Sequence, residues 1–445
     1  MKIPEVLRIQ VVHRAGSLAR VLTVVADAGL LVEGLVAVER APDSTIWELT
    51  TEIDEDFNWT LLAAIDGLPI AHLLGTSDRV LTVHEGGKIE TRSRLPITSD
   101  QQLRDLYTPG VARVCLAIRH QPQLSRRYTA IANTVAIVTD GSAVLGLGDV
   151  GPLAAMPVME GKAALFEQLV GLSGVPILVD THDPAAIADT VARIAPTFGA
   201  IQLEDIAAPA CFEVERALVG RLDRPVLHDD QHGTAVVALA ALLTASRVLR
   251  LDLAASTVGQ IGLGAAGTGI ARLLRHRGVG RLLGADRRPD ALAMFQDLGG
   301  TAASLERLMA ESDIVIATSG VRGLIAPDLV RHGQLILALS NPDPEIEPAI
   351  ALAAGARYAV DGKAVNNVLG FPGLFRGALD AGVAAFSLEM LDAAAERLSQ
   401  LADGDRLVPS PLDRDVHSAV AAAVATAARR ETHTPLYDIE ERSAA

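Results

Sequence analysis

The stretch that most restricts the possible folds is a glycine-rich turn that follows an apolar run. The run over residues 256–261 predicts a strand, and residues 268–277 predict a helix just after the turn. A glycine turn between a strand and a helix lets the backbone approach a pyrophosphate group, which the helix N-terminus then holds. The sequence therefore predicts an α/β domain with a Rossmann-type sheet and a bound dinucleotide. The G-x-G-x-x-G residues are Gly262, Gly264, Ala265, Ala266 and Gly267.

The acid that follows the next predicted strand indicates which dinucleotide is bound. Residues 281–285 predict that strand, and Asp286 comes directly after it, close to the spacing of the acid that binds the ribose hydroxyls. A carboxylate there repels a 2′-phosphate, so Asp286 favours NAD over NADP. Arg287 and Arg288 come next and leave NADP open as the alternative. A later predicted strand ends near Ser319, which is expected on the cofactor edge of the sheet.

Two further apolar runs, each interpreted as a buried strand, end in pairs of acids. The chain between them has room for one helix, and a right-handed crossover would place the two strand ends side by side. Carboxylates gathered in this way repel one another unless a cation lies among them, and Mg²⁺ and Mn²⁺ prefer such oxygen ligands. A polar turn without a ligand is the alternative for either pair alone. The acids are Glu204 and Asp205 after the first run, and Asp229 and Asp230 after the second.

Two more residues are assigned from expected helix starts. Lys162 precedes a helix predicted over residues 163–172, where the positive end of the helix dipole would lower the pKa of its amine. A lysine of lowered pKa is suited to act as a general base, and a solvated lysine is the alternative. Thr234 is expected to cap a helix over residues 235–249.

The first 85 residues predict a separate α+β unit. Its elements follow one another in the order β-α-β-β-α-β, which is typical of ferredoxin-like domains. Ser17 is placed as the N-cap of the first helix. The polar, glycine-containing stretch 86–96 is expected to link this unit to the rest of the chain. The expected strands cover residues 6–12, 31–40, 46–53 and 79–84, and the expected helices cover residues 18–28 and 60–66.

Charge and cysteine content narrow the class of protein. The 445 residues carry a formal net charge of −15 with 3% aromatic residues, which argues against a partner such as a nucleic acid or an anionic membrane. Cys115 and Cys211 form no CxxC pair and are interpreted as reduced thiols. The N-terminus lacks the features of a signal peptide, and no uncharged apolar run reaches the roughly 18 residues of a membrane span. We expect a cytoplasmic protein.

Taken in chain order, these stretches resemble those of a malic enzyme of the short bacterial type. The resemblance extends over residues from about 95 to 400. Residues 1–85 resemble an ACT domain through the turn Arg14-Ala15-Gly16-Ser17-Leu18, which implies a bound amino acid or small effector. A dimerisation module that binds nothing is the alternative. The matching stretches are YTPGVA (107–112), LGLGD (145–149), MEGK (159–162), LEDI (203–206), HDDQHGT (228–234), the glycine turn (262–267), SNP (340–342) and NNVLGFP (366–372).

The resemblance implies oxidative decarboxylation of L-malate to pyruvate and CO₂, with reduction of NAD⁺ and with Mg²⁺ or Mn²⁺ in the site. An NADP⁺-preferring malic enzyme and a malolactic-type enzyme are alternatives, and oxaloacetate decarboxylation is an expected side activity. An ACT-based effector sensor with a degenerate catalytic half is an alternative from another class. The expected order is an ACT-like regulatory domain (1–85), a linker (86–96), a catalytic and metal domain (97–230), a Rossmann NAD(P) domain (231–380), and a helical segment (381–445) with a loosely ordered tail from residue 431.

The resemblance also implies a homodimer or higher homo-oligomer and assigns roles to single residues. One departure concerns the substrate carboxylate. Larger eukaryotic malic enzymes hold it with an arginine where this chain has Ala143, so another group must make that contact. The implied roles are metal ligation by Glu204, Asp205 and Asp230 with Asp229 beside them, general base for Lys162, general acid for Tyr107, cofactor contact for Thr234, Ser319, Asp286 and the glycine turn, and substrate or nicotinamide contact for Asn341, Asn366 and Asn367. The two adjacent asparagines could instead cap the following helix.

Overall fold

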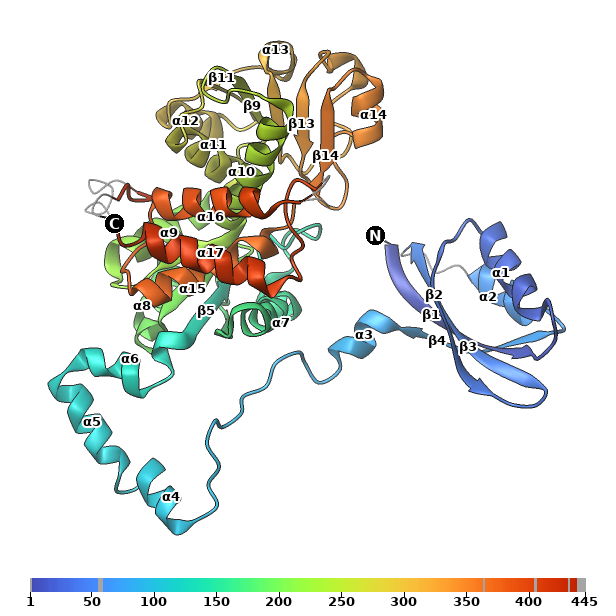
Figure 1. The fold of residues 1–445 in the computed structure, drawn as a ribbon, viewed down its shortest axis with the longest axis horizontal. Coiled ribbons are helices and arrows are strands. Elements are labelled where there is room, and N and C mark those ends of the chain that lie inside the picture. The colour runs from blue at the N-terminus through green and yellow to red at the C-terminus, as the bar shows by residue number, and fades with distance from the viewer. Residues whose placement is uncertain (1, 55–58, 363–364, 404–405, 431–432, 438–445) are drawn as a thin grey trace. The chain divides into compact units, whose positions relative to one another are not determined.

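The chain divides into two compact units, Met1–Glu90 and Thr91–Ala445 (Figure 1). The computed structural model describes residues 2–54, 59–362, 365–403, 406–430 and 433–437. The division between the units falls inside the stretch 86–96 that was assigned to a linker.

The first unit is an antiparallel four-stranded sheet with two helices packed on one face. The strand order is β2-β3-β1-β4. Alternate residues of β1, including Leu7 and Ile9, form a core with Val21 of α1 and Ile65 of α2. The predicted β-α-β-β-α-β order is therefore confirmed. The elements are β1 (Lys2–Val12), α1 (Ser17–Asp27), β2 (Val32–Arg40), β3 (Ser44–Asp54), α2 (Trp59–Asp66), β4 (Ala71–Asp78) and α3 (Arg79–His84).

Two local predictions in this unit are wrong. The last strand is β4, whose Leu73 packs on the core, and the residues predicted as that strand, 79–84, form α3 with exposed apolar side chains. The N-cap of α1 is Gly16 and not Ser17. The backbone at Gly16 has φ 84°, in the left-handed region that glycine enters without steric cost.

The second unit contains a parallel sheet that carries the acid pairs. Its strand order is β6-β5-β7-β8. The crossover from β7 to β8 through α9 makes these two strands neighbours, and their register sets Leu203 beside His228. The acids that follow each strand therefore begin at the same level of the sheet edge. The elements are β5 (Thr134–Thr139), α7 (Gly151–Val170), β6 (Ser173–Leu178), α8 (Pro184–Ile194), β7 (Ala200–Leu203), α9 (Ala210–Arg221) and β8 (Val226–His228).

The predicted Rossmann-type sheet is confirmed. Six parallel strands follow the order β11-β10-β9-β12-β13-β14, which is the doubly wound arrangement with its switch point beside β9. The helix after the glycine turn begins at Ala265, three residues before the predicted start. The elements are β9 (Thr257–Ile261), α11 (Ala265–His276), β10 (Arg281–Ala285), α12 (Pro289–Asp297), β11 (Thr301–Ala302), α13 (Leu305–Glu311), β12 (Ile314–Ala317), β13 (Leu335–Ala338), α14 (Pro348–Ala353) and β14 (Tyr358–Asp361).

The long helix α10 (Asp229–Leu249) joins the two sheets and corrects two predictions. Its N-cap is His228, so Thr234 lies inside the helix and does not cap it. The acids Asp229 and Asp230 form the first turn, where the positive end of the helix dipole favours them. The helix also crosses the domain boundary expected at 230/231. By length and composition alone α10 could span a membrane, but 72% of that apolar window is buried inside the fold, as in a core helix.

The C-terminal helices return to the sheet that carries the acids. Phe166 of α7 contacts Phe371 and Phe375 of α15 edge to face, with ring centroids 4.9 and 5.5 Å apart. The expected start of a C-terminal helical segment at residue 381 is therefore too late, because α15 already packs on α7. The helices are α15 (Phe371–Ala381), α16 (Leu388–Leu401) and α17 (Arg414–Ala427).

The tail was predicted to be loosely ordered, and for residues 433–437 this is wrong. Leu436 and Tyr437 are buried. Residues 431–432 and 438–445 of the predicted tail lie outside the described residues.

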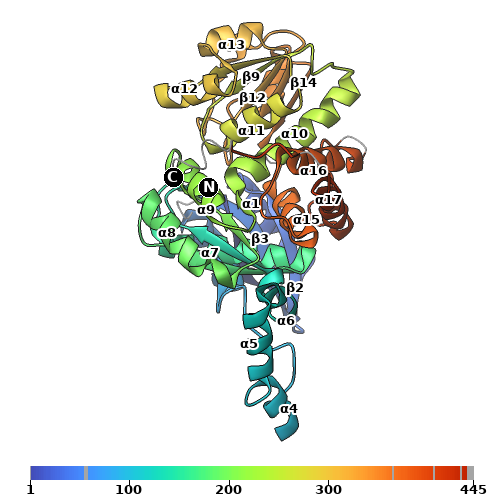
Figure 2. The ribbon, with the colours of Figure 1, turned by 90° about the vertical axis from the view of Figure 1, so that its left-hand side faces the viewer.

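Residues 97–121, named here the arm, project away from the rest of the second unit in both views (Figures 1 and 2). The arm carries α4 (Asp100–Leu106) and α5 (Val111–His120), and the short helix α6 (Ser125–Tyr128) connects it to the body. The structure describes every residue of α4 and α5, and none of them is buried. The arm is thus held by its own helices and not by the core of its own chain.

Candidate active site

Three carboxylates gather where β7 and β8 end. Glu204, Asp205 and Asp230 each offer one oxygen, and these oxygens all lie within 4.8 Å of one another. The Asp230 carboxylate accepts a hydrogen bond from the Asp205 backbone N–H at 2.8 Å, which ties the two strand ends together. Asp205 has φ 53°, a left-handed conformation that non-glycine residues rarely adopt and that is found most often at functional sites. The structure therefore brings together the three acids for which metal ligation was expected.

Lys162 reaches this cluster from α7. Its Nζ lies 2.5 Å from Asp229 Oδ2 and 3.0 Å from Glu204 Oε1, and it stands over the ring of Phe371 at 4.5 Å. The side chain is almost entirely buried, since the residue is 8% exposed. Lys162 thus contacts two acids of the cluster directly, Asp229 and Glu204.

The reason given for a reactive Lys162 is wrong. The helix begins at Gly151 and not at Ala163, so Lys162 lies in its middle, away from the positive end of the dipole. Burial by itself would lower the lysine pKa, but the charges of Asp229, Glu204 and Asp230 outweigh it, and the pKa of Lys162 is raised. Any role of Lys162 as a base therefore depends on its position and not on a lowered pKa.

The pKa values of the four acids are shifted in different directions. Burial raises the pKa of Glu204 well above its usual value, and raises that of Asp205 to about 7 with a further contribution from Asp230. Burial also raises the pKa of Asp229, against the charge of Lys162. Burial opposes ionisation of Asp230 as well, but the hydrogen bond and charge of His228 lower its pKa. Three buried acids and the partly exposed Asp230 lie beside one lysine and are therefore short of positive charge.

The same residues fit a divalent cation. Asp205 Oδ2 is buried and has no hydrogen-bond partner among the described residues, although buried carboxylate oxygens are normally paired. A hard cation such as Mg²⁺ or Mn²⁺ takes oxygen ligands and would supply the missing positive charge. Glu204, Asp205 and Asp230 are the residues that would hold it.

Asp229 is packed more tightly than any other member of the cluster. It is fully buried, and its Oδ2 accepts hydrogen bonds from Lys162 and from the Asn367 amide, the latter at 3.1 Å. A Cβ at Gly233 would come within 1.9 Å of its Oδ1, so only glycine fits one turn further along α10. Asn367 therefore reaches the site. Asn366 does not, because its side chain caps the short helix Asn367–Leu369 and the residue is exposed.

The glycine turn borders a cavity of about 620 Å³ at the edge of the Rossmann-type sheet. Asp286 Oδ2 accepts a hydrogen bond from the Leu263 backbone N–H at 2.7 Å, which holds the turn against β10. A Cβ at Gly267 would come within 1.9 Å of the Gly262 carbonyl oxygen, so the close helix packing requires glycine there. The cavity is lined by Gly262, Gly264, Asp286, Arg287, Arg288 and Ser319, and Ala208 from the loop after β7 borders it as well.

The loop that carries Ser319 is fastened to the next strand end. Glu345 Oε1 accepts hydrogen bonds from the Ser319 backbone N–H at 2.6 Å and from its hydroxyl at 2.8 Å. The same oxygen accepts a hydrogen bond from the Ser340 hydroxyl, directly before Asn341. A Cβ on Gly146 would come within 3.6 Å of Pro342, so the 145–149 loop faces the Asn341 turn. Asn341 thus lies where the two halves of the second unit approach each other.

The structure does not bring Tyr107 to Lys162 of the same chain. Tyr107 lies between α4 and α5 on the arm and is 69% exposed. The prediction from the resemblance assumed that the YTPGVA stretch folds against the acids, whereas the arm extends away from the body of the second unit (Figures 1 and 2).

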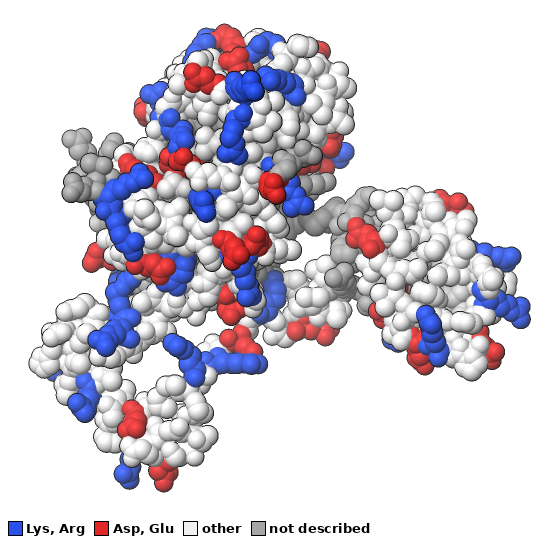
Figure 3. All heavy atoms as spheres, viewed as in Figure 1, with Lys and Arg blue, Asp and Glu red and all other residues white. Residues whose placement is uncertain are grey.

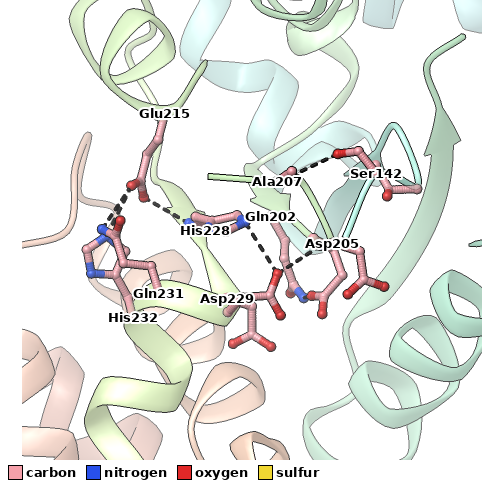
Figure 4. A network of polar contacts seen from close by, with 12 residues as sticks. Ser142, Gln202, Asp205, Ala207, Glu215, His228, Asp229, Gln231 and His232 are labelled. Carbon is pink, nitrogen blue, oxygen red and sulfur yellow. Dashed lines mark hydrogen bonds and ion pairs between the residues drawn. The ribbon is translucent and has the colours of Figure 1, made fainter. Parts of the chain in front are cut away.

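Sequence reasoning missed buried polar residues that hydrogen-bond to the acids or to the backbone next to them (Figure 4). Glu215 of α9 is fully buried and accepts a hydrogen bond from the His228 backbone N–H at 2.8 Å. Gln202 donates to Glu204 Oε2 at 2.5 Å. A signal for Glu215 was present, because an acid stands on the face of α9 that otherwise carries the apolar residues Cys211 and Leu218. For Gln202, a polar residue within the short apolar strand was the corresponding signal.

The relatives that match most of this chain are malic enzymes, and two family models match parts of it. The model described as "Malic enzyme, N-terminal domain" matches residues 86–187, and "D-isomer specific 2-hydroxyacid dehydrogenase, NAD binding domain" matches residues 225–321. NAD-dependent malic enzyme 1 of Bacillus subtilis is 52% identical over 416 residues, covering 93% of this chain and 95% of that protein. The NAD-dependent malic enzyme of Geobacillus stearothermophilus is 38% identical, with 95% and 94% covered. The solved structure of an NAD-dependent malic enzyme from Thermotoga maritima is 35% identical with a TM-score of 0.74, covering 78% of this chain and 99% of that one.

Proposed function

The chain belongs to the malic enzyme family, and from this premise we propose that it oxidatively decarboxylates L-malate to pyruvate and CO₂ with NAD⁺ and a divalent cation. One observation carries the proposal beyond family membership. The buried acids Glu204 and Asp205 and the partly exposed Asp230 offer oxygens within 4.8 Å of one another, and Lys162 stands 3.0 Å from the first of them. A chelating hydroxy acid needs such a cation site with a proton acceptor beside it.

The residues of the chain supply binding and proton transfer. Glu204, Asp205 and Asp230 would hold Mg²⁺ or Mn²⁺, which would polarise a hydroxyl or ketone oxygen of the substrate, and NAD⁺ would be the hydride acceptor. The Lys162 ammonium donates a hydrogen bond to Asp229, and once its proton has passed to that carboxylate, the neutral amine takes the proton of the malate hydroxyl. Asp229 and Glu204 hold the amine in place. The Tyr107 hydroxyl donates a proton to the carbon that CO₂ leaves. Asn367, held by Asp229, is placed to contact the substrate at the same edge.

NAD⁺ is the proposed oxidant because Asp286 holds the turn at the ribose end of the cavity. Its carboxylate is fixed by the Leu263 N–H at 2.7 Å, so its charge stays where a 2′-phosphate would lie. Arg287 and Arg288 line the same cavity and are the groups that NADP⁺ would use.

The test of the function is malate-dependent reduction of NAD⁺ and NADP⁺ in parallel, followed at 340 nm with Mn²⁺ and in excess EDTA, with pyruvate and lactate measured at the end. We expect NADH and pyruvate in equal amounts with Mn²⁺, and no turnover with EDTA until Mn²⁺ is restored. Lactate without accumulation of NADH would indicate malolactic chemistry. Full turnover in EDTA would contradict the metal site, and no turnover under any condition would favour an effector sensor.

We also propose that Tyr107 acts on the site of a second copy of this chain, so that a homodimer is the functional unit. The arm exposes apolar side chains, including Leu103, Leu106 and Leu116, and most of its visible surface carries neither acidic nor basic residues (Figure 3). Exposed apolar surface of this kind is typical of protein interfaces. A second copy is the favoured occupant because its site also lacks a Tyr107 from its own chain, and a two-fold exchange of arms would complete both sites at once.

For the first unit we propose an ACT-like effector site. A cavity of about 340 Å³ lies beside the turn that precedes α1 and is lined by His13, Arg14, Arg40 and Trp47. Two arginines and a histidine favour a carboxylate-bearing ligand. Titration of amino acids and small carboxylates against tryptophan fluorescence should give a saturable change that Arg40→Ala weakens. An unchanged signal for every such compound would leave a role in assembly as the better account.

A further inference from the structure

The C-terminal segment 433–437 contacts both halves of the second unit. The Tyr437 ring lies beside Arg216 of α9 and Arg272 of α11, with guanidinium carbons 5.8 and 4.7 Å from the ring centroid. Arg272 also donates a hydrogen bond to the Leu436 carbonyl oxygen at 2.6 Å. Helix α9 belongs to the sheet that carries the acids, and α11 begins at the glycine turn. Tyr437, which is 3% exposed, is thus enclosed between the metal half and the nucleotide half.

The segment is anchored before it reaches this position. The Thr434 backbone N–H donates to both carboxylate oxygens of Glu389 at 3.0 and 2.9 Å, in the first turn of α16. Pro435 forms an isolated bridge with Ser387, the N-cap of that helix. These contacts fix the position of residues 434 and 435, so that Tyr437 is inserted at a defined place between the two halves of the unit.

The Tyr437 hydroxyl meets a buried acid that supports the metal site. It donates a hydrogen bond to Glu215 Oε2, and the same oxygen lies 3.1 Å from His232 Nε2. The other oxygen, Oε1, accepts the His228 backbone N–H at 2.8 Å (Figure 4). Glu215 therefore holds the turn from β8 into α10 on both sides of Asp229 and Asp230.

The contacts continue to a residue that would hold the cation. His228 Nε2 lies 3.3 Å from Asp230 Oδ2, and Asp230 in turn accepts the Asp205 N–H at 2.8 Å. A change in the place of Glu215 would move the His228 backbone and, with it, the Asp230 carboxylate. Groups that orient metal ligands in this way commonly change metal affinity by about 10–100-fold when they are lost.

We propose that Tyr437 is a positioning residue for the divalent-cation site, acting through Glu215 and the backbone of His228 on Asp230. This inference rests on the proposed function in one respect, namely that a divalent cation binds at Glu204, Asp205 and Asp230. It adds that the affinity for the cation depends on a hydrogen bond from the C-terminal segment, more than 200 residues away along the chain.

The test compares Mn²⁺ binding to the full-length protein and to Tyr437→Phe by calorimetric titration, without malate or NAD⁺. The variant keeps the ring between the two arginines and removes only the hydroxyl, and we expect its Kd for Mn²⁺ to rise about tenfold. The Kd for NAD⁺ should stay within about twofold, because Asp286 and the glycine turn are untouched. Tyr128→Phe, at an exposed tyrosine of α6, is the matched control and should bind Mn²⁺ like the parent.

A second variant, Glu215→Gln, tests whether Tyr437 acts through Glu215. Glu215→Gln should also weaken Mn²⁺ binding, and the double variant should be no weaker than Glu215→Gln alone, since both changes break one series of contacts. A lowered Tm of Tyr437→Phe with an unchanged Kd for Mn²⁺ would reduce the tyrosine to a structural role and overturn the proposal. A parent protein that binds no Mn²⁺ would instead contradict the metal site itself.

Discussion

Replacing Lys162 by alanine should lower kcat for malate by about 10²–10⁴-fold, the usual contribution of a positioned acid or base. The amine lies 2.5 Å from Asp229 and 3.0 Å from Glu204, at the edge of the expected cation site, and it is the only lysine described there. No other described basic side chain is held by both of these acids, so no obvious group could take its place. The rate is to be measured at saturating malate, NAD⁺ and Mn²⁺.

The control for this variant has to separate chemistry from folding. Lys162 also compensates buried carboxylates, and removing one partner of a buried ion pair can cost about 3–5 kcal/mol of stability. Bound Mn²⁺ should restore much of that stability, because it supplies the missing charge to Glu204. A Tm near that of the parent in Mn²⁺ together with the large loss of kcat would support the role. Lys88→Ala, a lysine of the first unit, should leave kcat unchanged. Turnover of Lys162→Ala within about tenfold of the parent would exclude Lys162 as the base.

Tyr107→Phe should be impaired to a similar degree, by about 10²–10⁴-fold in kcat, since the phenol hydroxyl is the proposed acid. The more decisive result comes from mixing Tyr107→Phe with Lys162→Ala after dissociation and reassociation. If each arm completes the site of the other copy, half of the dimers are mixed, and each mixed dimer has one site with both residues intact. The mixture should then recover about a quarter of the parent activity.

The same mixture contradicts exchange of the arms if it is no more active than its two components. In that case the arm would have to fold back on its own chain during turnover. Tyr128→Phe, just beyond the arm, is again a suitable control and should leave the rate unchanged in either arrangement.

The local sequence pattern predicted a large part of the fold, because strands and helices alternate along the chain of a parallel α/β domain and their crossovers are right-handed. The glycine turn, the strand before it and Asp286 after the next strand lie within residues 257–286, and all were placed on the correct edge. The acid pairs were predicted to meet because β7 and β8 are joined by a short helix, and a right-handed crossover leaves them as neighbours. In each case the deciding contacts are close in the sequence or follow from strand order.

Helix boundaries were predicted less well, with a consequence for the chemistry. Helix α7 begins eleven residues before Lys162, although Pro157 and Gly161 interrupt its pattern and suggest a later start. Packing of Phe166 against α15 and of Met159 in the core holds the helix together across these weak positions. The pKa argument built on the later start was therefore wrong, even though the lysine it singled out lies in the site.

The sequence by itself determined the fold class, the dinucleotide edge and the set of acids, because each follows from residues that are neighbours along the chain or in strand order. Only the tertiary structure decided that Tyr107 stands on a projecting arm, that Lys162 is held in mid-helix by two acids, and that Tyr437 reaches Glu215. These placements depend on burial and hydrogen bonds between residues far apart in the sequence. A local pattern records which side chains are apolar or charged, but not which distant partner will cover them.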